Sequence, residues 1–258
     1  MLSGVEPHRP VRGGAELLHG YRRLAGQQAR AWILRTLPVC SSTETQLSRW
    51  LQTQPQFSCP RAVIASRQRQ GVGQRGRRWV SPAGGLWISA ALPWSGAGVG
   101  RVGLLGLAVA VAIAQRLESK GLPVRVKWPN DLMIGDRKLA GLLPGVVQRG
   151  TTVRLMRVGV GLNVRNRVPE GGVSLHHLPG QGAADPCQWG REVLLALDRC
   201  MEAGGDGSWC LPDLERLLWA DRIRNPRDGR IWRITGLGPD GALEVQDGAS
   251  CETWRRWP

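Results

Sequence analysis

Residues 126–141 read VKWPNDLMIGDRKLAG, and this stretch carries more information about fold and chemistry than any other. Its first residues predict a short strand that Pro129 ends. Asn130 and Asp131 then lie in the turn after the strand, where side chains are free to meet a ligand. A carboxylate there suits a magnesium ion that bridges phosphate oxygens, because Mg²⁺ needs only one or two protein ligands at such sites. An Asx turn that merely stabilises the loop explains the two residues equally well.

The second half of the stretch predicts a hairpin. Residues 132–147 contain two strand-like runs, and the dipeptide Gly135-Asp136 between them is typical of a tight turn. Lys138 opens the second strand, which is otherwise apolar, and two small residues follow at 140–141. A lysine in this setting is directed into a pocket, or it protects an edge strand against aggregation. The stretch alone leaves both interpretations open.

A glycine- and arginine-rich loop precedes this region, since residues 67–79 read RQRQGVGQRGRRW. Its three glycines let the backbone approach a ligand closely. Backbone N–H groups and guanidinium forks together suit a phosphate or an acyl phosphate. The glycine spacing also matches a dinucleotide-binding fingerprint, but Pro82 follows where a helix is needed, and residues 84–101 hold no acidic residue. We therefore expect an anion-binding loop, with a nucleic-acid-binding loop as the alternative.

A third segment, residues 158–164, reads VGVGLNV. Its two glycines alternate with apolar residues, so one face of the predicted strand is flat and admits a planar group. Asn163 offers both a donor and an acceptor, which suits the edge of an adenine. Alternating glycines also occur where two backbones simply pack closely, and this explanation stays open.

The remaining sequence predicts an α+β domain followed by a small β unit. Short strands are expected at 62–65 and 86–92, and helices at 103–118, 189–201 and 211–219. After Asn225-Pro226 the pattern changes to short strands and tight turns, typical of a small β-barrel. Residues 1–30 are rich in Gly, Arg and Gln with weak apolar periodicity, which predicts a poorly ordered arm or a frayed helix.

The composition limits the function classes. The net charge of +15 attracts polyanions such as nucleic acid, nucleoside triphosphates or an acidic protein, although a generally basic surface is an equally good explanation. Six cysteines form no CxxC pair, which favours free thiols over a zinc site or a disulfide framework. With four histidines, two of them adjacent, a histidine general base has little support. The absence of a long apolar run or a signal-peptide pattern makes a cytoplasmic protein the expectation.

In this order and spacing, these segments together with Ser42-Thr43 resemble the biotin–protein ligase family over about residues 32–256. The most specific part is KWPND, followed by KLAG beginning seven residues after its Asp. The resemblance is to the short form without an N-terminal DNA-binding domain. It implies an α+β fold with a mixed β-sheet flanked by helices, as in class II synthetases, and a small C-terminal SH3-like β-barrel. The expected divisions are an arm at 1–30, a catalytic domain at 31–222 and a β domain at 223–258.

The resemblance also implies an activity and a set of residues. The enzyme would use ATP, biotin and Mg²⁺ to form biotinyl-5′-AMP, and would transfer biotin to a lysine of the biotin carrier domain of acetyl-CoA carboxylase. It would act as a cytoplasmic monomer or homodimer, without a specific nucleic-acid partner and without a membrane. The implied catalytic residues are Lys138, Asp131 and Arg75, with Asp131 also as the magnesium ligand. The implied biotin site consists of Ser42, Thr43, Glu44, Gln68, Gly71, Val72, Gly73, Gln74, Gly85, Leu86, Trp87, Lys138 and Gly141. The implied ATP or adenylate site consists of Trp79, Lys127, Asn130, Asp131 and Asn163.

Three positions depart from the family pattern. Val72 and Gln74 stand where the family usually has arginine or another polar residue, and Glu44 occupies a position that is often asparagine. We expect a weaker hold on the adenylate, which the neighbouring arginines compensate in part. A lipoate or related acyl ligase is the nearest alternative, because lipoate ligases share the fold. A nucleic-acid-binding protein is a distant one, because no helix-turn-helix segment precedes residue 31.

Overall fold

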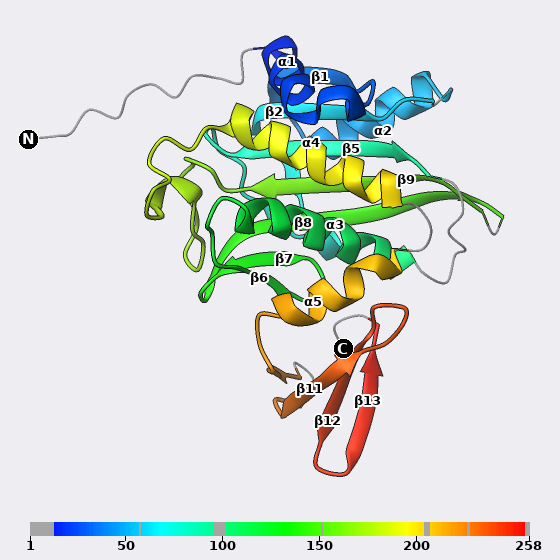
Figure 1. Cartoon of the computed structure of the whole chain (residues 1–258), viewed down its shortest axis with the longest axis vertical. Coiled ribbons are helices and arrows are strands. Elements are labelled where there is room, and N and C mark those ends of the chain that lie inside the picture. Colours follow the sequence, from blue (N-terminus) through cyan, green and yellow to red (C-terminus); the bar gives the residue numbers. More distant parts are fainter. Residues whose placement is uncertain are drawn as a thin grey trace, which may run out of the picture.

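A seven-stranded mixed sheet forms the centre of the protein in the computed structural model, which describes residues 13–56, 58–94, 102–150, 152–203, 207–225 and 228–255. The strand order is β1-β2-β5-β9-β8-β7-β6, with β1 and β2 parallel and the other neighbours antiparallel (Figure 1). The strands are β1 (Ile33–Cys40), β2 (Arg61–Gln68), β5 (Leu86–Pro93), β6 (Val124–Lys127), β7 (Asp131–Ile134), β8 (Arg137–Arg149) and β9 (Thr152–Leu162). The hairpin predicted around Gly135-Asp136 is confirmed as β7–β8.

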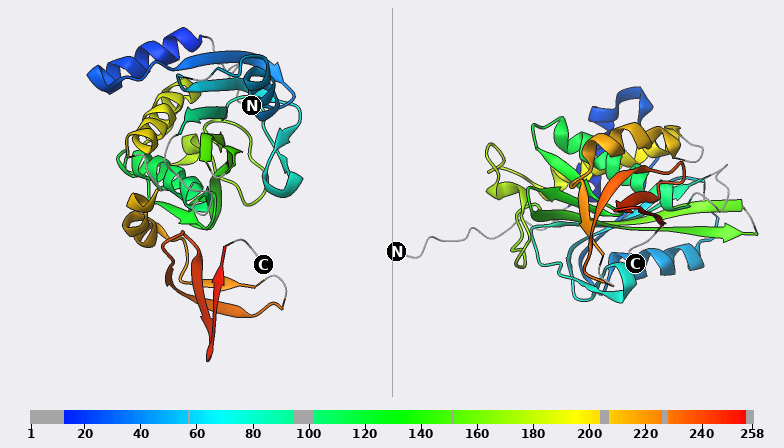
Figure 2. Two further views of the ribbon diagram at one scale, coloured as in Figure 1. Left: turned by 90° about the vertical axis from the view of Figure 1, so that its right-hand side faces the viewer. Right: turned by 90° about the horizontal axis from the view of Figure 1, so that it is seen from below.

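Helices cover both faces of this sheet. On one face lie α1 (Gly14–Ala25), α3 (Val102–Glu118), α4 (Pro186–Ala203) and α5 (Leu211–Leu217), and on the other lies α2 (Thr43–Thr53) (Figure 2). Strand residues alternate between the faces, so that Leu86, Ile88 and Ala90 enter the core with α3 while Ser89 points to the α2 side. The apolar sequence of α3 fits its burial on nearly every side. No helix among the described residues is long and apolar enough to cross a membrane.

The N-terminal segment corrects one expectation. Leu17 and Tyr21 of α1 are fully buried, and a short 3-10 turn, Gly26–Gln28, follows the helix. The hydroxyl of Tyr21 and the indole of Trp32 both donate to Asp198 of α4, whose pKa burial raises despite these two donors. Of the two expectations for residues 1–30, a poorly ordered arm or a frayed helix, the structure agrees with a helix at Gly14–Ala25, but this helix is packed against α4. Residues 1–12 lie outside the described residues. Contacts more than 160 residues apart in sequence leave no local periodic signal.

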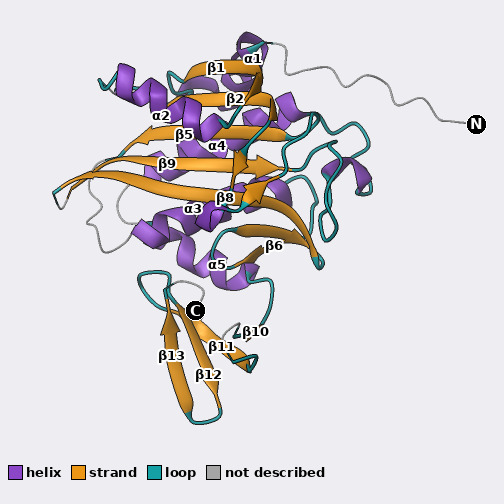
Figure 3. Ribbon diagram, turned by 180° about the vertical axis from the view of Figure 1, so that it is seen from behind, coloured by secondary structure: helices purple, strands orange, loops and turns teal. Residues whose placement is uncertain are grey.

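The C-terminal unit is a four-stranded antiparallel sheet that lies beyond α5 (Figure 3). Its strands are β10 (Arg222–Arg224), β11 (Ile231–Leu237), β12 (Leu243–Asp247) and β13 (Ser250–Trp254). Within the described residues β10 and β13 are its two edges and do not pair, so the sheet is open and the predicted barrel is not confirmed. The indole of Trp128 donates to the carbonyl of Gly241 at 3.0 Å, which ties this sheet to the end of β6.

Candidate functional site

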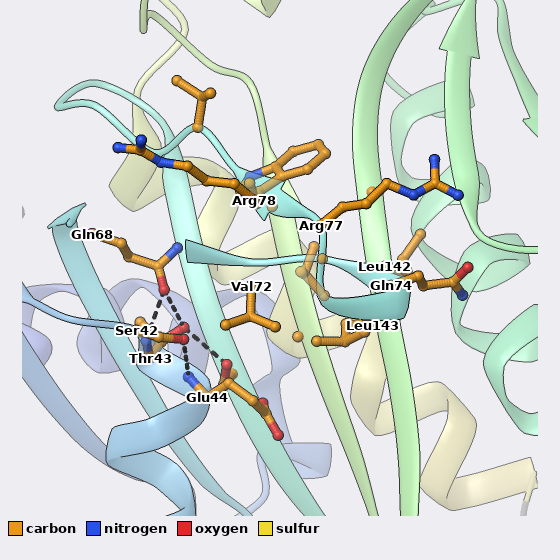
Figure 4. A pocket seen from close by; sticks show the side chains of 18 of the residues that line it. Ser42, Thr43, Glu44, Gln68, Val72, Gln74, Arg77, Arg78, Leu142 and Leu143 are labelled. Atoms are coloured by element: carbon orange, nitrogen blue, oxygen red, sulfur yellow. Dashed lines mark hydrogen bonds between the residues drawn. The ribbon is translucent and has the colours of Figure 1, made fainter. Parts of the chain in front are cut away.

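A cavity of about 300 Å³ lies on the α2 side of the sheet (Figure 4). The beginning of α2 and strands β5, β7, β8 and β9 form its floor and walls, and the glycine- and arginine-rich loop covers it. Its size suits a small organic ligand. Three segments that the sequence singled out, at residues 67–79, 126–141 and 158–164, therefore meet at one place.

The cover is a short hairpin made of β3 (Gly71–Val72) and β4 (Arg78–Trp79). A 3-10 turn, Gln74–Gly76, closes it, with the amide of Gly73 donating to the carbonyl of Arg77 at 2.7 Å. Gly71 is required here, because a Cβ at this position would lie 2.4 Å from the carbonyl oxygen of Trp79. The loop thus folds over the cavity without opening an α-helix, as expected from Pro82.

The floor consists of two rows of residues that face each other across neighbouring strands. Gly141, Gly161 and Trp87 form one row, and Leu143, Gly159 and Ser89 form the next. The indole of Trp79 lies on the first row, since a Cβ at Gly161 would lie 2.3 Å from its Nε1 and one at Gly141 would lie 2.9 Å from its ring. The flat strand face predicted from the alternating glycines is confirmed, and its glycines make room for an aromatic ring.

One end of the cavity carries charge. Lys138 Nζ lies 2.7 Å from Asp131 Oδ1 and 5.0 Å from the ring centroid of Trp79. Asp131 faces Gly141 across β7 and β8, so the ion pair stands at the first glycine row. The backbone of Lys138 is itself fixed, since its amide donates to Gly171 and its carbonyl accepts from Val173. The lysine points into a pocket, as one of its two interpretations predicted.

A polar wall stands at the second row. Gln68 Oε1 accepts from the amide of Thr43 at 2.7 Å and from its hydroxyl at 3.0 Å, and its Nε2 donates to Ser81 at 2.8 Å. The Thr43 hydroxyl also lies 2.9 Å from that of Ser89. Ser42 caps α2 by accepting from the amide of Glu44 at 3.2 Å (Figure 4). These polar groups largely satisfy one another.

The described residues that line the cavity include no cysteine or histidine. Burial raises the pKa of the Cys40 thiol, the cysteine nearest in sequence to the polar wall, so a thiolate there is disfavoured at neutral pH. No group of three or more His, Cys, Asp or Glu side chains is placed to hold a metal ion in the described part of the chain. The Lys138–Asp131 pair and Arg77 give the cavity cations that can neutralise an anionic ligand.

Several residues predicted for the site lie elsewhere. Lys127 turns away and stacks over the ring of Trp219 at 4.7 Å, beside a second cavity of about 330 Å³ next to β10. Asn163 is buried, with its amide 3.4 Å from the carbonyl of Lys138 and its oxygen bonded to Asn166. Arg75 is exposed at the tip of the hairpin and does not line the cavity. The remaining predicted residues outside the lining are Gly71, Gly85, Leu86 and Trp87, of which Trp87 supports Trp79 at 6.5 Å between ring centroids.

Other lining residues were missed. Ser89 lies in an apolar strand, and only its alternation with Leu86, Ile88 and Ala90 distinguishes the face that it occupies. Arg77, in the hairpin that covers the cavity, is also a lining residue (Figure 4). Arg157 does not line the cavity, but it contacts the lining residue Glu44 from β9, 113 residues later, and no local pattern connects the two.

The fold and the cavity define the class of the protein as an α+β domain whose cavity lies under an arginine-rich hairpin. Residues 36–163 match the model of the "Biotin/lipoate A/B protein ligase family". The chain is therefore similar to this family over 128 of its 258 residues.

Individual relatives agree. The bifunctional ligase/repressor BirA of Escherichia coli is 36% identical over 133 residues, which are 51% of this chain and 40% of that protein. The biotin–[acetyl-CoA-carboxylase] ligase of Paracoccus denitrificans is 31% identical over 138 residues, 52% of this chain and 57% of that protein. The matches thus span between 40% and 57% of the length of these two relatives.

A solved structure shows the same fold. The biotin protein ligase of Aquifex aeolicus, in complex with biotin and ATP, superposes with a TM-score of 0.72 at 22% identity, covering 87% of this chain and 96% of that one.

Proposed function

We propose that the protein is an ATP-dependent biotin–protein ligase, which forms biotinyl-5′-AMP and transfers biotin to a lysine of a carrier domain. The observation that carries this proposal is the Lys138–Asp131 ion pair beside Trp79, in a cavity between a glycine floor and a cationic hairpin. The relatives support it, since the ones named above are biotin ligases by description.

In the first step, an oxygen of the biotin carboxylate attacks the α-phosphorus of ATP. The bond from that phosphorus to the bridging oxygen breaks, and pyrophosphate leaves with the electron pair. Lys138 neutralises the charge that collects on the carboxylate and the α-phosphate, and Asp131 holds its ammonium group in place. Trp79 and Arg77 line the same space, with an aromatic surface for adenine and a cation for phosphate.

In the second step, the amine of the acceptor lysine attacks the acyl carbon of the mixed anhydride. The acyl–oxygen bond breaks, AMP leaves, and the nitrogen loses a proton, and we assign the acceptance of this proton to the Asp131 carboxylate. Magnesium would be bound mainly by the triphosphate, with Asp131 as its protein carboxylate, since Mg²⁺ needs few protein ligands when phosphate is present. When bound, the ion would supply positive charge for the pyrophosphate leaving group.

The acceptor that we propose is the biotin carrier domain of acetyl-CoA carboxylase in the cytoplasm. A net charge of +15 favours encounter with an acidic partner. The small C-terminal sheet, which would correspond to the SH3-like unit of the family, stands next to the domain that carries the cavity.

The test has two parts. Purified protein with ATP and labelled pyrophosphate is expected to show exchange that depends on biotin, and a carrier domain incubated with protein, ATP and biotin is expected to gain the mass of one biotinyl group. Exchange that is independent of biotin, or a carrier of unchanged mass, would count against the proposal. Competition between biotin and lipoate separates this function from a lipoate ligase.

A further inference from the structure

Glu44 differs from the rest of the polar wall. Thr43, Gln68 and Ser89 already bond to one another, as described above. Glu44 also lines the cavity, yet its Oε2 is buried and has no hydrogen-bond partner among the described residues. A buried carboxylate oxygen without a donor costs free energy, so an acceptor kept at this place calls for an explanation.

The position of this oxygen is next to the second floor row. A Cβ built on Gly159 would lie 3.9 Å from Glu44 Oε2 and 3.7 Å from Ser89 Oγ. Because residue 159 has no side chain, the space beside the carboxylate oxygen stays open to a ligand on the floor. Gly161 follows on the same face, about 7 Å further along the strand, toward Trp79 and Lys138. Glu44 therefore stands at the end of the cavity away from the charged pair.

Arg157 holds Glu44 in this orientation. It comes from β9, two residues before Gly159, and its guanidinium bonds to Glu44 Oε1 and to the hydroxyl of Ser48 at 2.5 Å. Both side chains of the pair are about one-fifth to one-quarter exposed, at 21% and 24%. With Oε1 engaged by the arginine, Oε2 is left facing the cavity as an acceptor only.

We infer that Glu44 Oε2 accepts a hydrogen bond from an N–H group on the head of the acyl substrate, and that Arg157 positions Glu44 for this contact. The inference rests on the proposed function and specifies its substrate class, a carboxylic acid whose ring carries a urea-like N–H. A dithiolane head offers no donor, so it would leave the carboxylate oxygen buried and unsatisfied. A binding site that accepts a hydrogen bond from its substrate discriminates strongly against analogues without the donor group, because the acceptor of the site is then left unpaired.

The test compares three acids by calorimetry on the full-length protein without ATP. Biotin carries a ureido N–H, lipoate has none, and 2-iminobiotin carries a guanidinium, which is a stronger donor to a carboxylate. Glu44→Gln is expected to weaken biotin binding roughly 10- to 100-fold, the range for a hydrogen bond to a charged group. Binding of 2-iminobiotin is expected to fall more steeply, and that of lipoate to change less than about threefold.

Arg157 is tested as a positioning residue. Arg157→Met is expected to raise the KM for biotin in pyrophosphate exchange with little change in kcat, because it disturbs a contact that ground state and transition state share. Arg157→Lys restores part of the loss. Arg154→Met is the matched control on the same strand, since Arg154 is exposed and does not line the cavity. The double variant Glu44→Gln with Arg157→Met keeps the charge balanced, and circular dichroism melts confirm that each variant folds.

The outcomes separate the two proposals. If the wild-type protein neither binds biotin nor shows biotin-dependent exchange, the proposed function fails and the inference fails with it. If biotin is used but Glu44→Gln weakens all three acids equally or none of them, only the inference is overturned. A selective loss for biotin and 2-iminobiotin, with an unchanged melting temperature in the double variant, supports it.

Discussion

The floor of the cavity and its hairpin cover differ in how tightly their residues are packed. The floor is made of β8 and β9, which pair over residues 140–149 and lie inside the sheet. Gly141 and Gly161 are needed there because the Trp79 ring already occupies the space above them. The cover is a two-residue ladder with exposed arginines, and Val72 within it is 45% exposed.

The difference shows where the protein tolerates change. On the floor, position is fixed by neighbours on several sides, so a small alteration moves groups that the reaction needs. On the cover, side chains extend into solvent and one cation can replace another. We therefore expect substitutions in the floor to abolish activity and those in the cover to adjust it.

The largest effect is expected for Lys138→Ala. Lys138 Nζ lies 2.7 Å from Asp131 Oδ1. Loss of this cation removes stabilisation of the negative charge formed during adenylation. The expected cost is about 2–4 kcal/mol of transition-state stabilisation, by analogy with the loss of an oxyanion donor. Biotin-dependent pyrophosphate exchange measures it. Arg137→Ala is the control, since this neighbouring residue is exposed and outside the cavity lining, and a similar loss in both variants would remove the special role of Lys138.

Gly161→Val is expected to have the next largest effect. Its side chain would occupy the place of the Trp79 indole, whose Nε1 lies 2.3 Å from a Cβ at this position, and the hairpin would be displaced with it. Exchange is expected to fall about 100-fold, the effect of a misplacement of roughly 1 Å. Gly145→Ala is the matched control in β8, because a Cβ there meets nothing within 4 Å. Equal activity of the two variants would show that Trp79 need not rest on the floor.

A smaller effect is expected in the cover, where Gln74→Arg adds a cation beside the cavity. The gain is expected to be within about 1 kcal/mol, or roughly fivefold, as for a partly exposed ion pair. It should appear as slower release of the acyl adenylate after a single turnover, with the rate of its formation little changed. Val147→Arg adds the same charge at an exposed position on β8 outside the cavity lining. An equal slowing in that control would attribute the effect to net charge alone.

The sequence predicted what depends on neighbours in the chain. The β7–β8 hairpin and the flat face of β9 follow from spacing within about 15 residues, and the structure confirms them. Such features can be predicted because turn dipeptides and the alternation of side chains along a strand depend only on residues close in the sequence. The same spacing left the direction of Lys138 open between a pocket and an edge strand, and in the structure Lys138 lines the cavity.

What the sequence did not predict depends on contacts between distant segments. Tyr21 of α1 meets Asp198, and Glu44 meets Arg157, over 177 and 113 residues. The helix α1 is buried against α4, which begins at Pro186, far from α1 in the sequence. Asn163 and Lys127 have residue types that suit a nucleotide, but the strand ends on which they lie turn their side chains toward Asn166 and Trp219. Residue type indicates chemistry, whereas the register decides direction.

The smallest effect is expected at the tip of the cover, for Arg75→Gly. Arg75 has φ of 56°, in the left-handed region where a side chain costs roughly 1–2 kcal/mol and glycine does not. Because its side chain does not line the cavity, the variant is expected to keep exchange activity within about threefold, while the hairpin gains up to roughly 1 kcal/mol in stability. Arg75→Ala separates the two effects, since it removes the guanidinium and keeps the strained backbone. A loss of activity in both variants, comparable with that of Lys138→Ala, would contradict this expectation. It would show that the Arg75 side chain takes part in catalysis and that the hairpin moves closer to the substrate during the reaction.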